Sequence, residues 1–548
     1  MGFTLSENAV AIASFEENLA ARQAAPLSTF QAYSIVMKWN RSAATLLTAA
    51  LAVAVFVPAI PSSAASSADA ARRDSDAIGA PIQAMPPDPA IERALARISP
   101  TEIQHTIATL VSFRNRSTLS SMDNDLPKGT GVTAAAEWIE SQFKEISAAC
   151  DGCLEVQRDT FTQPPLPGPN ARVTQPTTIT NVYAILRGTD PAQASRMLLV
   201  TGHYDSRDSS NFDTKGEAPG ANDDATGTAV SLACARALSK IKVPATLVFV
   251  AVAGEEQGLL GSKHLAQFAK QQGWQLEGVL NNDIVGGNTT PGDKFQDKHA
   301  VRVFSEPVPA NGTPQEIRRL LFLGYDSDSP SRELARAITY TARTYTGAPA
   351  SPTQPITTGL EAVLEFRHDR FMRGGDHESF NEEGFPAVRF TEWREDFNHQ
   401  HQNVRVEDGV QYGDLLKYDD FDYIARVARL NAATMAVLAA APPPPGNVQF
   451  PPPPRVFNNS VNDTQITWQN GPGAPAGTRY EIVWRSTAAA DWQRSIPADK
   501  AGATHNRDTW SVTLPISKDN VVFGVRSFDA AGHRSPAVVP MPATPPRM

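Results

Sequence analysis

Between residues 90 and 283 the spacing of apolar positions alternates between a helical and a strand-like pattern. A period near 3.6 predicts helices over residues 90–113, 131–146, 226–240 and 259–272. Short apolar runs predict strands over residues 178–186, 197–202, 246–253 and 276–283. Several of these runs are almost purely apolar, which is typical of parallel strands covered on both faces. The alternation therefore predicts an α/β layer fold with a largely parallel sheet.

The alternation is interrupted over residues 287–330, which are rich in Gly, Pro, Asn and Asp. Long irregular segments inside a domain are often functional. A strand pattern returns at residues 386–390, and a long helical pattern at 418–440 closes the unit. We place the boundaries of this first domain at residues 91–441.

The C-terminal part of the chain has a different period. Residues 442–455 are proline-rich and predict a semi-rigid spacer. Short alternating strands separated by turn residues follow over 456–542 and predict an all-β sandwich. The order of Trp468, Tyr480, Trp484 and Phe523 resembles a fibronectin type III domain. For this domain we expect contact with a surface, a polymer or the first domain, with a passive spacer as the alternative.

The N-terminal region has the layout of an export signal. A basic stretch at residues 37–41 precedes an apolar run at 43–57 and a segment of small residues up to 65, so we predict a signal peptide over 37–65. The apolar run is short for a membrane span, although an N-terminal anchor is the alternative. We treat 1–36 as a doubtful upstream extension, with Met37 as the true start, and 66–90 as a flexible linker. The expected location is secreted or periplasmic, without stable membrane insertion after cleavage.

Net charge and cysteine content limit the possible partners and metal sites further. The net charge of −9 over 548 residues argues against a nucleic-acid partner held through phosphates. Cys150 and Cys153 are too few for a zinc ribbon, so we predict a local disulfide, with a redox motif as the weaker alternative. Cys234 is expected to be a buried small side chain.

Acidic and imidazole side chains gather where the predicted strands end, which is where open α/β sheets bind ligands. They fall in five short segments, 203–205, 223–224, 255–256, 283 and 399–401. Adjacent glutamates have a clear use, because one can bind a metal while its neighbour moves protons. Two histidines and three carboxylates are ligands that zinc accepts, and five ligands suit two ions that share one carboxylate.

As an ordered set, these motifs resemble the secreted dizinc aminopeptidases of metallopeptidase family 28, which are related to carboxypeptidase Q and glutamate carboxypeptidase II. The resemblance covers residues 91–441 and implies a three-layer α/β/α fold with a mainly parallel mixed sheet. It implies two Zn²⁺ ions per chain that share a water, peptide or protein substrates, and removal of N-terminal residues. It further implies metal ligands at His203, Asp223, Glu256, Asp283 and His399, with Asp223 bridging, Glu255 as general base, Asp205 orienting His203, and a cis peptide after Asp223.

Two positions depart from the family's pattern. Gly375 stands where the family has a serine before Asp-His. His399 is assigned as the last ligand because Asn403 then stands at the position of the family's aspartate, whereas His401 lacks that partner.

Other functions remain open at this point. A carboxypeptidase or dipeptidase uses the same site chemistry, with Arg302, Arg367 or Arg389 as candidates to bind a substrate carboxylate. A one-zinc acyl-transferring cyclase and a catalytically inactive exported binding protein are further alternatives, and the complete ligand set argues against both.

Overall fold

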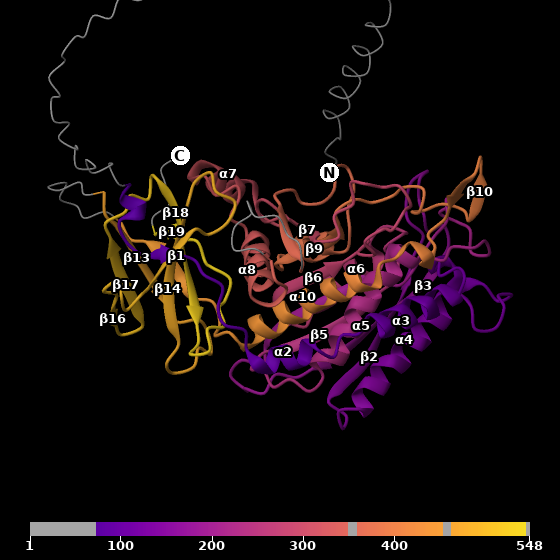
Figure 1. Ribbon diagram of the computed structural model, residues 1–548, viewed down its shortest axis with the longest axis horizontal. Coiled ribbons are helices and arrows are strands. Elements are labelled where there is room, and N and C mark those ends of the chain that lie inside the picture. Colours follow the sequence, from indigo (N-terminus) through magenta and orange to yellow (C-terminus); the bar gives the residue numbers. More distant parts are fainter. Residues whose placement is uncertain (1–72, 349–358, 453–461, 544–548) are drawn as a thin grey trace, which may run out of the picture. The chain divides into compact units, whose positions relative to one another are not determined.

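The computed structural model describes residues 73–348, 359–452 and 462–543. The predicted signal peptide at 37–65 and the upstream extension at 1–36 lie outside these residues. Between Leu154 and Glu392 the chain forms a mixed sheet of eight strands in the order β2-β3-β5-β4-β6-β9-β7-β8 (Figure 1). Their bounds are β2 Leu154–Gln163, β3 Thr177–Leu186, β4 Arg196–His203, β5 Thr246–Val252, β6 Gln275–Asn282, β7 Ala300–Ser305, β8 Glu361–Glu365 and β9 Ala387–Glu392.

Parallel pairing dominates the centre of this sheet. Strands β5, β4, β6 and β9 pair in parallel, and so do β7 and β8. Strands β2, β3 and β5 pair antiparallel at one side, and β7 runs antiparallel to β9 at the other. Because β4, β5 and β6 are parallel neighbours, their carboxyl ends meet at one edge of the sheet.

Helices cover both faces of the sheet, because its central strands are apolar on both sides. Leu198 and Val200 of β4 belong to a core shared with α5 and α10, whereas Met197 and Leu199 face a second core with α6 and α9. The helices are α2 Pro89–Leu95, α3 Pro100–Ser112, α4 Gly131–Ala148, α5 Thr226–Leu238, α6 Leu260–Gln271, α7 Pro314–Leu323, α8 Pro330–Tyr345, α9 His377–Glu382 and α10 Phe421–Ala440. The predicted three-layer α/β/α fold is confirmed.

Some predicted elements differ from the structure in physically clear ways. The helix expected over 90–113 is two helices, because Pro100 cannot continue α2 and instead occupies the first turn of α3. The segment 287–330, which lacked periodicity, contains β7 and α7. None of the helices in the described ranges is both long and apolar enough to cross a membrane.

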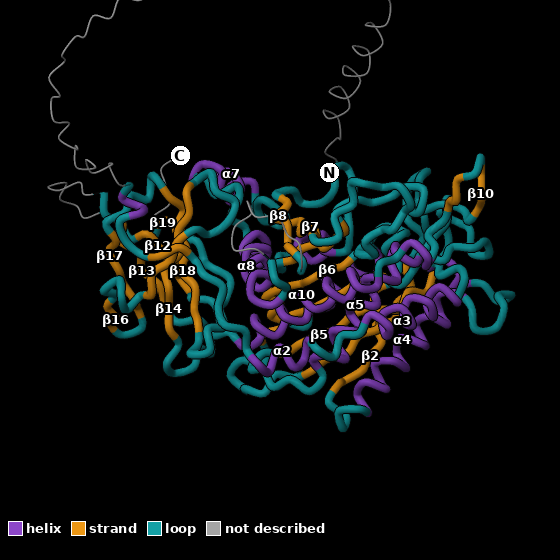
Figure 2. The backbone as a smooth tube through the Cα atoms, in the orientation of Figure 1, coloured by secondary structure: helices purple, strands orange, loops and turns teal. Residues whose placement is uncertain are grey.

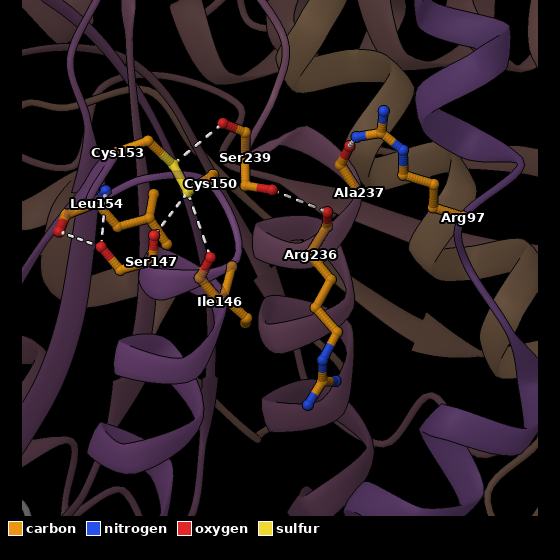
Figure 3. Close-up of a disulfide and its surroundings, with 9 residues drawn as sticks. All are labelled: Arg97, Ile146, Ser147, Cys150, Cys153, Leu154, Arg236, Ala237 and Ser239. Atoms are coloured by element: carbon orange, nitrogen blue, oxygen red, sulfur yellow. Dashed lines mark hydrogen bonds between the residues drawn. A yellow bond between two sulfur atoms is a disulfide. The ribbon is translucent and has the colours of Figure 1, made fainter.

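The predicted disulfide between Cys150 and Cys153 is confirmed, and it closes the turn between α4 and β2 (Figure 3). Cys153 Sγ lies 3.1 Å from the backbone oxygen of Ser239, just past the end of α5. Cys234 is buried in α5, as expected. The disulfide therefore lies at the end of α5, among backbone oxygens, and Cys234 is a separate core residue.

The C-terminal residues, together with β1, form two further sheets with strand orders β16-β17-β13-β12-β19 and β1-β15-β14-β18. Most of their strands are labelled among the orange segments of Figure 2. Trp468, Trp484 and Phe523 are buried in a common core. The strands are β1 Ala80–Pro81, β12 Gly446–Phe450, β13 Thr464–Gln469, β14 Arg479–Ser486, β15 Arg494–Pro497, β16 Thr504–Asn506, β17 Thr509–Leu514, β18 Val521–Phe528 and β19 Met541–Pro542. These all-β elements agree with the predicted sandwich.

Two segments expected to be linkers contribute strands to these sheets. Ala80 and Pro81, inside the expected flexible linker 66–90, pair with β15, and Trp484 Nε1 donates to the backbone oxygen of Ser75. Residues 446–450, inside the expected proline-rich spacer, form β12 and pair with β13 and β19. Neither segment is only a connection between domains.

Candidate metal centre

The predicted site residues lie where three parallel strands end. His203 is the last residue of β4, Glu255 and Glu256 follow β5, and Asp283 follows β6. Asp223 lies in the short helical turn Ala221–Ala225 that precedes α5. Because the strands are neighbours in the sheet, side chains separated by up to 80 positions in the sequence meet at one edge.

These side chains form two groups of possible metal ligands that meet at Asp223. In each of the groups His203–Glu255–Asp283 and Asp223–Glu256–His401, one ligand atom per residue lies within 4.8 Å of the others. Asp223 Oδ1 is 3.1 Å from His203 Nε2, and Asp223 Oδ2 is 2.8 Å from His401 Nε2. The two oxygens of one carboxylate therefore face the two groups, which is the arrangement expected of a bridging ligand.

The last histidine of the site differs from the sequence assignment. His401, and not His399, lies beside Asp223, with its Nε2 atom 2.9 Å from Glu256 Oε1. The ring of His399 stacks on Tyr418 at 3.6 Å, and its Nδ1 atom is 3.0 Å from the Thr290 hydroxyl. The loop carries His401 at a φ of 52°, a region that few non-glycine residues adopt, and the sequence pattern does not reveal such local geometry.

Asn403 does not serve as the partner that the sequence assignment required. Its Oδ1 atom accepts a hydrogen bond from the backbone N–H of Ser209, 3.1 Å away. The histidine of the second group is instead contacted by Arg207, whose Nη2 atom lies 2.6 Å from His401 Nδ1. Arg207 Nε also donates to Glu256 Oε2 at 2.7 Å, so one guanidinium holds two members of the group.

His203 is held by the segment that follows it. Its Nδ1 atom is 3.1 Å from the backbone oxygen of Asp205 and 3.5 Å from Asp205 Oδ1. Asp205 Oδ2 accepts from the Thr118 hydroxyl at 3.0 Å and from the Glu256 backbone N–H at 3.3 Å. The other ring nitrogen, Nε2, lies 3.1 Å from Asp223 Oδ1 and 3.9 Å from Asp283 Oδ2. Asp205 is therefore placed where it could orient the ring of His203.

The loop that presents Asp223 is held by residues that sequence reasoning missed. Asp414 accepts from the backbone N–H groups of Asn222 and Asp223, both at 2.8 Å. The buried Arg116 donates to the backbone oxygens of Pro219 and Gly220, at 2.5 and 2.8 Å. The peptide bond between Asp223 and Asp224 is cis, as the resemblance implied.

A fully buried arginine holds the carboxylate of Asp283. Arg389 Nη2 lies 2.8 Å from Asp283 Oδ1, and Arg389 Nη1 lies 3.3 Å from Asp369 Oδ2. A Cβ atom at Gly375 would lie 2.4 Å from Arg389 Nη1, so a serine in this backbone position would displace the guanidinium. Gly375 therefore leaves room for Arg389, which orients a site carboxylate and does not face a substrate.

The close packing of acids and imidazoles strongly shifts the pKa values of these groups. Burial raises the pKa of Glu255 well above its usual range, and the nearby Asp283 and Glu256 add to the rise. Burial also favours the neutral form of His401, but Glu256 and Asp223 outweigh it and raise the His401 pKa to about 10. The surrounding carboxylates thus favour a positive charge at the position of His401. A group of carboxylates with this property is suited to bind a cation.

The donor atoms of the two groups are of the types that zinc accepts. They are imidazole nitrogens and carboxylate oxygens, taken from two histidines and three acids once Glu255 is set aside as a general base. Glu256 Oε1 and His401 Nε2 are buried and only 2.9 Å apart, yet neither has a partner with hydrogen-bond geometry among the residues that the structure describes. Unpartnered buried polar atoms are costly in a folded protein, and a shared cation would satisfy both.

The site opens into a cavity of about 560 Å³. Asp223, Glu255, Glu256, Asp283 and His401 line it on one side. The exposed side chains of Met372 and Phe397 and several arginines are also among the residues that line it. A second cluster, His368, His377 and Glu378, also brings possible ligand atoms within 4.8 Å, but none of its residues lines this cavity.

Comparison with known proteins agrees with this geometry. Residues 181–311, which contain every site residue except His401, match Peptidase family M28. A probable zinc metalloprotease of Pyrenophora tritici-repentis is 38% identical over 471 residues, which are 85% of this chain and 89% of that protein. A probable zinc metalloprotease of Pyricularia oryzae is 39% identical over 481 residues, covering 85% of this chain and 88% of that protein.

Among solved structures, the LapA aminopeptidase of Legionella pneumophila is 19% identical, with a TM-score of 0.41. That match covers 64% of this chain and 74% of LapA. The identity and coverage of the two fungal relatives establish the relationship without it. The chain therefore belongs to peptidase family M28 and is a metallopeptidase.

Proposed function

We propose that the protein is a zinc-dependent exopeptidase with two Zn²⁺ ions per chain, and that it removes N-terminal residues from peptides. The observation that carries this proposal is the position of Asp223, whose two oxygens face His203 and His401 separately. A carboxylate shared in this way is what two neighbouring ions need. Zinc in the names of the fungal relatives supports the choice of metal.

Each residue of the site then has a role. His203 and Asp283 would hold one ion, Glu256 and His401 the other, and Asp223 both. Bound zinc supplies a Lewis acid that polarises the scissile carbonyl and lowers the pKa of water. Arg389 and Arg207 keep Asp283 and Glu256 in place through the ion pairs at 2.8 and 2.7 Å.

Glu255 is the residue that moves protons. It lines the cavity beside the ligand atoms of His203 and Asp283. A carboxylate oxygen of Glu255 accepts a proton from the attacking water and delivers it to the nitrogen of the leaving amine.

The exopeptidase type is tested by comparing leucine p-nitroanilide with its N-acetyl derivative. Acetylation removes the free amino group that an aminopeptidase requires, so we expect release of nitroaniline from the first compound and at least about 100-fold less from the second. N-blocked peptides provide the counter-test. If the protein leaves leucine p-nitroanilide intact and shortens blocked peptides from their C-terminus, it is a carboxypeptidase that uses the same residues.

We further propose that the protein is exported and that residues 456–542 form a fibronectin type III-like domain. The disulfide between Cys150 and Cys153 supports export, because such bonds persist in oxidising compartments. Expression of the full chain followed by N-terminal sequencing of the exported protein is expected to give a start near residue 66. Retention in the cytoplasm with an intact N-terminus contradicts the export proposal.

A further inference from the structure

Four arginine side chains line the cavity beside the metal-binding groups: Arg172, Arg207, Arg370 and Arg373. Three of them are already paired with carboxylates of the protein. Arg207 pairs with Glu256 at 2.7 Å, and Arg370 with Glu395 at 3.1 Å. Arg373 also pairs with Glu395. Arg370 also pairs with Asp369 at 2.9 Å, and Glu395 is shared with Arg302. These ion pairs fix the positions of the three guanidinium groups within the protein.

Arg172 differs from the other three. It lies in the connection between β2 and β3, and it forms no ion pair with any acid in the described parts of the chain. One of its nitrogens, Nη1, donates to the backbone oxygen of Glu256 at 2.7 Å. A guanidinium carries five N–H donors in a planar fork, so most of its donors remain available on the cavity wall.

The hydrogen bond to Glu256 places Arg172 beside one of the metal-binding groups. Glu256 contributes its side chain to the Asp223–Glu256–His401 group and its backbone oxygen to Arg172. The guanidinium is thus held by the backbone of a residue whose side chain belongs to the metal-binding group. A substrate bound at that group would lie in the same cavity as Arg172.

We propose that Arg172 binds a carboxylate of the substrate one residue from the scissile bond. The planar fork of arginine matches the two oxygens of a carboxylate, and the cation has no acidic partner of its own among the described residues. The carboxylate belongs either to the C-terminus of a dipeptide or to an acidic side chain next to the scissile bond. This inference rests on the proposed peptidase function and names the substrate class for the same site.

The candidates that the sequence suggested for this role are placed elsewhere. Arg389 is buried against Asp283, and Arg302 Nη2 pairs with Glu395 at 3.1 Å. Arg367 lies over the ring of Phe371 and does not line the cavity. Arg172 is therefore the cavity arginine best able to accept a carboxylate from outside.

The test compares substrates that differ only in their carboxylate. Kinetic constants are measured for Leu-Ala, Leu-Ala amide and Leu-Asp amide with the wild-type protein and with Arg172→Gln and Arg172→Lys. We expect the wild type to favour a carboxylate-bearing substrate over Leu-Ala amide on the order of 10- to 100-fold in kcat/KM. Arg172→Gln is expected to abolish this preference, so that its kcat/KM becomes similar on all three substrates, and Arg172→Lys to retain part of the preference.

The pattern of results identifies the source of the carboxylate. Preference for Leu-Ala indicates a terminal carboxylate, and preference for Leu-Asp amide indicates an acidic side chain. Arg187→Gln is the matched control, because Arg187 is exposed, pairs with Glu155 and lies outside the cavity. That variant is expected to keep the wild-type preference.

Two outcomes overturn the proposal: equal kcat/KM of the wild type on all three substrates, or an equal loss on all three with Arg172→Gln. If the wild type cleaves none of the three, the aminopeptidase function has failed separately. The same comparison is then made on an N-blocked peptide as its free acid and its amide, where equal rates also overturn the role of Arg172.

Discussion

The Glu255→Gln protein is expected to keep its metal and to lose peptide hydrolysis by a factor of about 10² to 10⁴, the usual contribution of a general base. Glutamine preserves the size of the side chain but cannot accept a proton. Glu255 lines the cavity beside the ligand atoms of His203 and Asp283, so the change removes proton transfer at the reacting centre. The measurements are kcat/KM on leucine p-nitroanilide and zinc content of the same preparation.

A matched variant separates this effect from a general change of charge. Glu217 is an exposed glutamate paired with Arg114 at 3.7 Å, and Glu217→Gln is expected to retain full activity. If Glu255→Gln loses zinc together with activity, Glu255 is a ligand and another group must move the proton. If it stays fully active, Glu255 has no catalytic role.

The second large effect is expected when His401 is replaced by alanine, whereas the same replacement at His399 serves as the control. His401→Ala removes the only imidazole of the Asp223–Glu256–His401 group and should lower zinc content from about two to about one per chain. Loss of groups that merely support a ligand costs about 10- to 100-fold in metal affinity or activity, so loss of a ligand should cost at least about 100-fold in activity. The zinc content of the purified protein and its kcat/KM check both expectations.

His399→Ala is the matched control, because His399 stacks on Tyr418 and contacts Thr290 away from the ligand groups. It is expected to retain both ions, with a modest loss of stability from the missing stack. The opposite pattern, in which His399→Ala loses zinc and His401→Ala does not, contradicts the placement of the loop in this structure.

The central part of the fold could be predicted from the sequence because its signals are local. Strands β4 and β5 contain continuous apolar runs, β3 and β6 contain shorter ones, and α5 and α6 show clear helical spacing. Edge strands carry weaker signals. Strand β2 alternates polar and apolar residues irregularly, and β7 lies in a segment rich in turn residues whose pairing with β9 spans about 90 positions. A local pattern does not contain such pairings.

The same distinction between local patterns and long-range contacts applies to the candidate site. His203, Asp223, Glu256 and Asp283 could be found because each lies at or shortly after the end of a predicted strand, or shortly before a predicted helix. The choice between His399 and His401 depends on loop geometry, including the positive φ of His401. The supports from Arg116, Asp414 and Arg389 are contacts over about 100 to 190 positions, and no motif marks them.

The linkers were misjudged for a related reason. Composition alone marked residues 66–90 as flexible and 442–455 as a spacer. Yet Ala80 and Pro81 pair with Ser495 and Arg494, more than 400 positions away. Prolines at 442–445 flank strand β12 and do not interrupt it, since they precede Gly446.

The most direct test of this account is a crystal structure of the zinc-loaded protein with anomalous scattering measured at the zinc absorption edge. The account predicts two anomalous peaks, one beside His203 and Asp283 and one beside Glu256 and His401, with Asp223 contacting both. A single peak that leaves out His401, or no peak at these residues in a preparation that hydrolyses leucine p-nitroanilide, contradicts it.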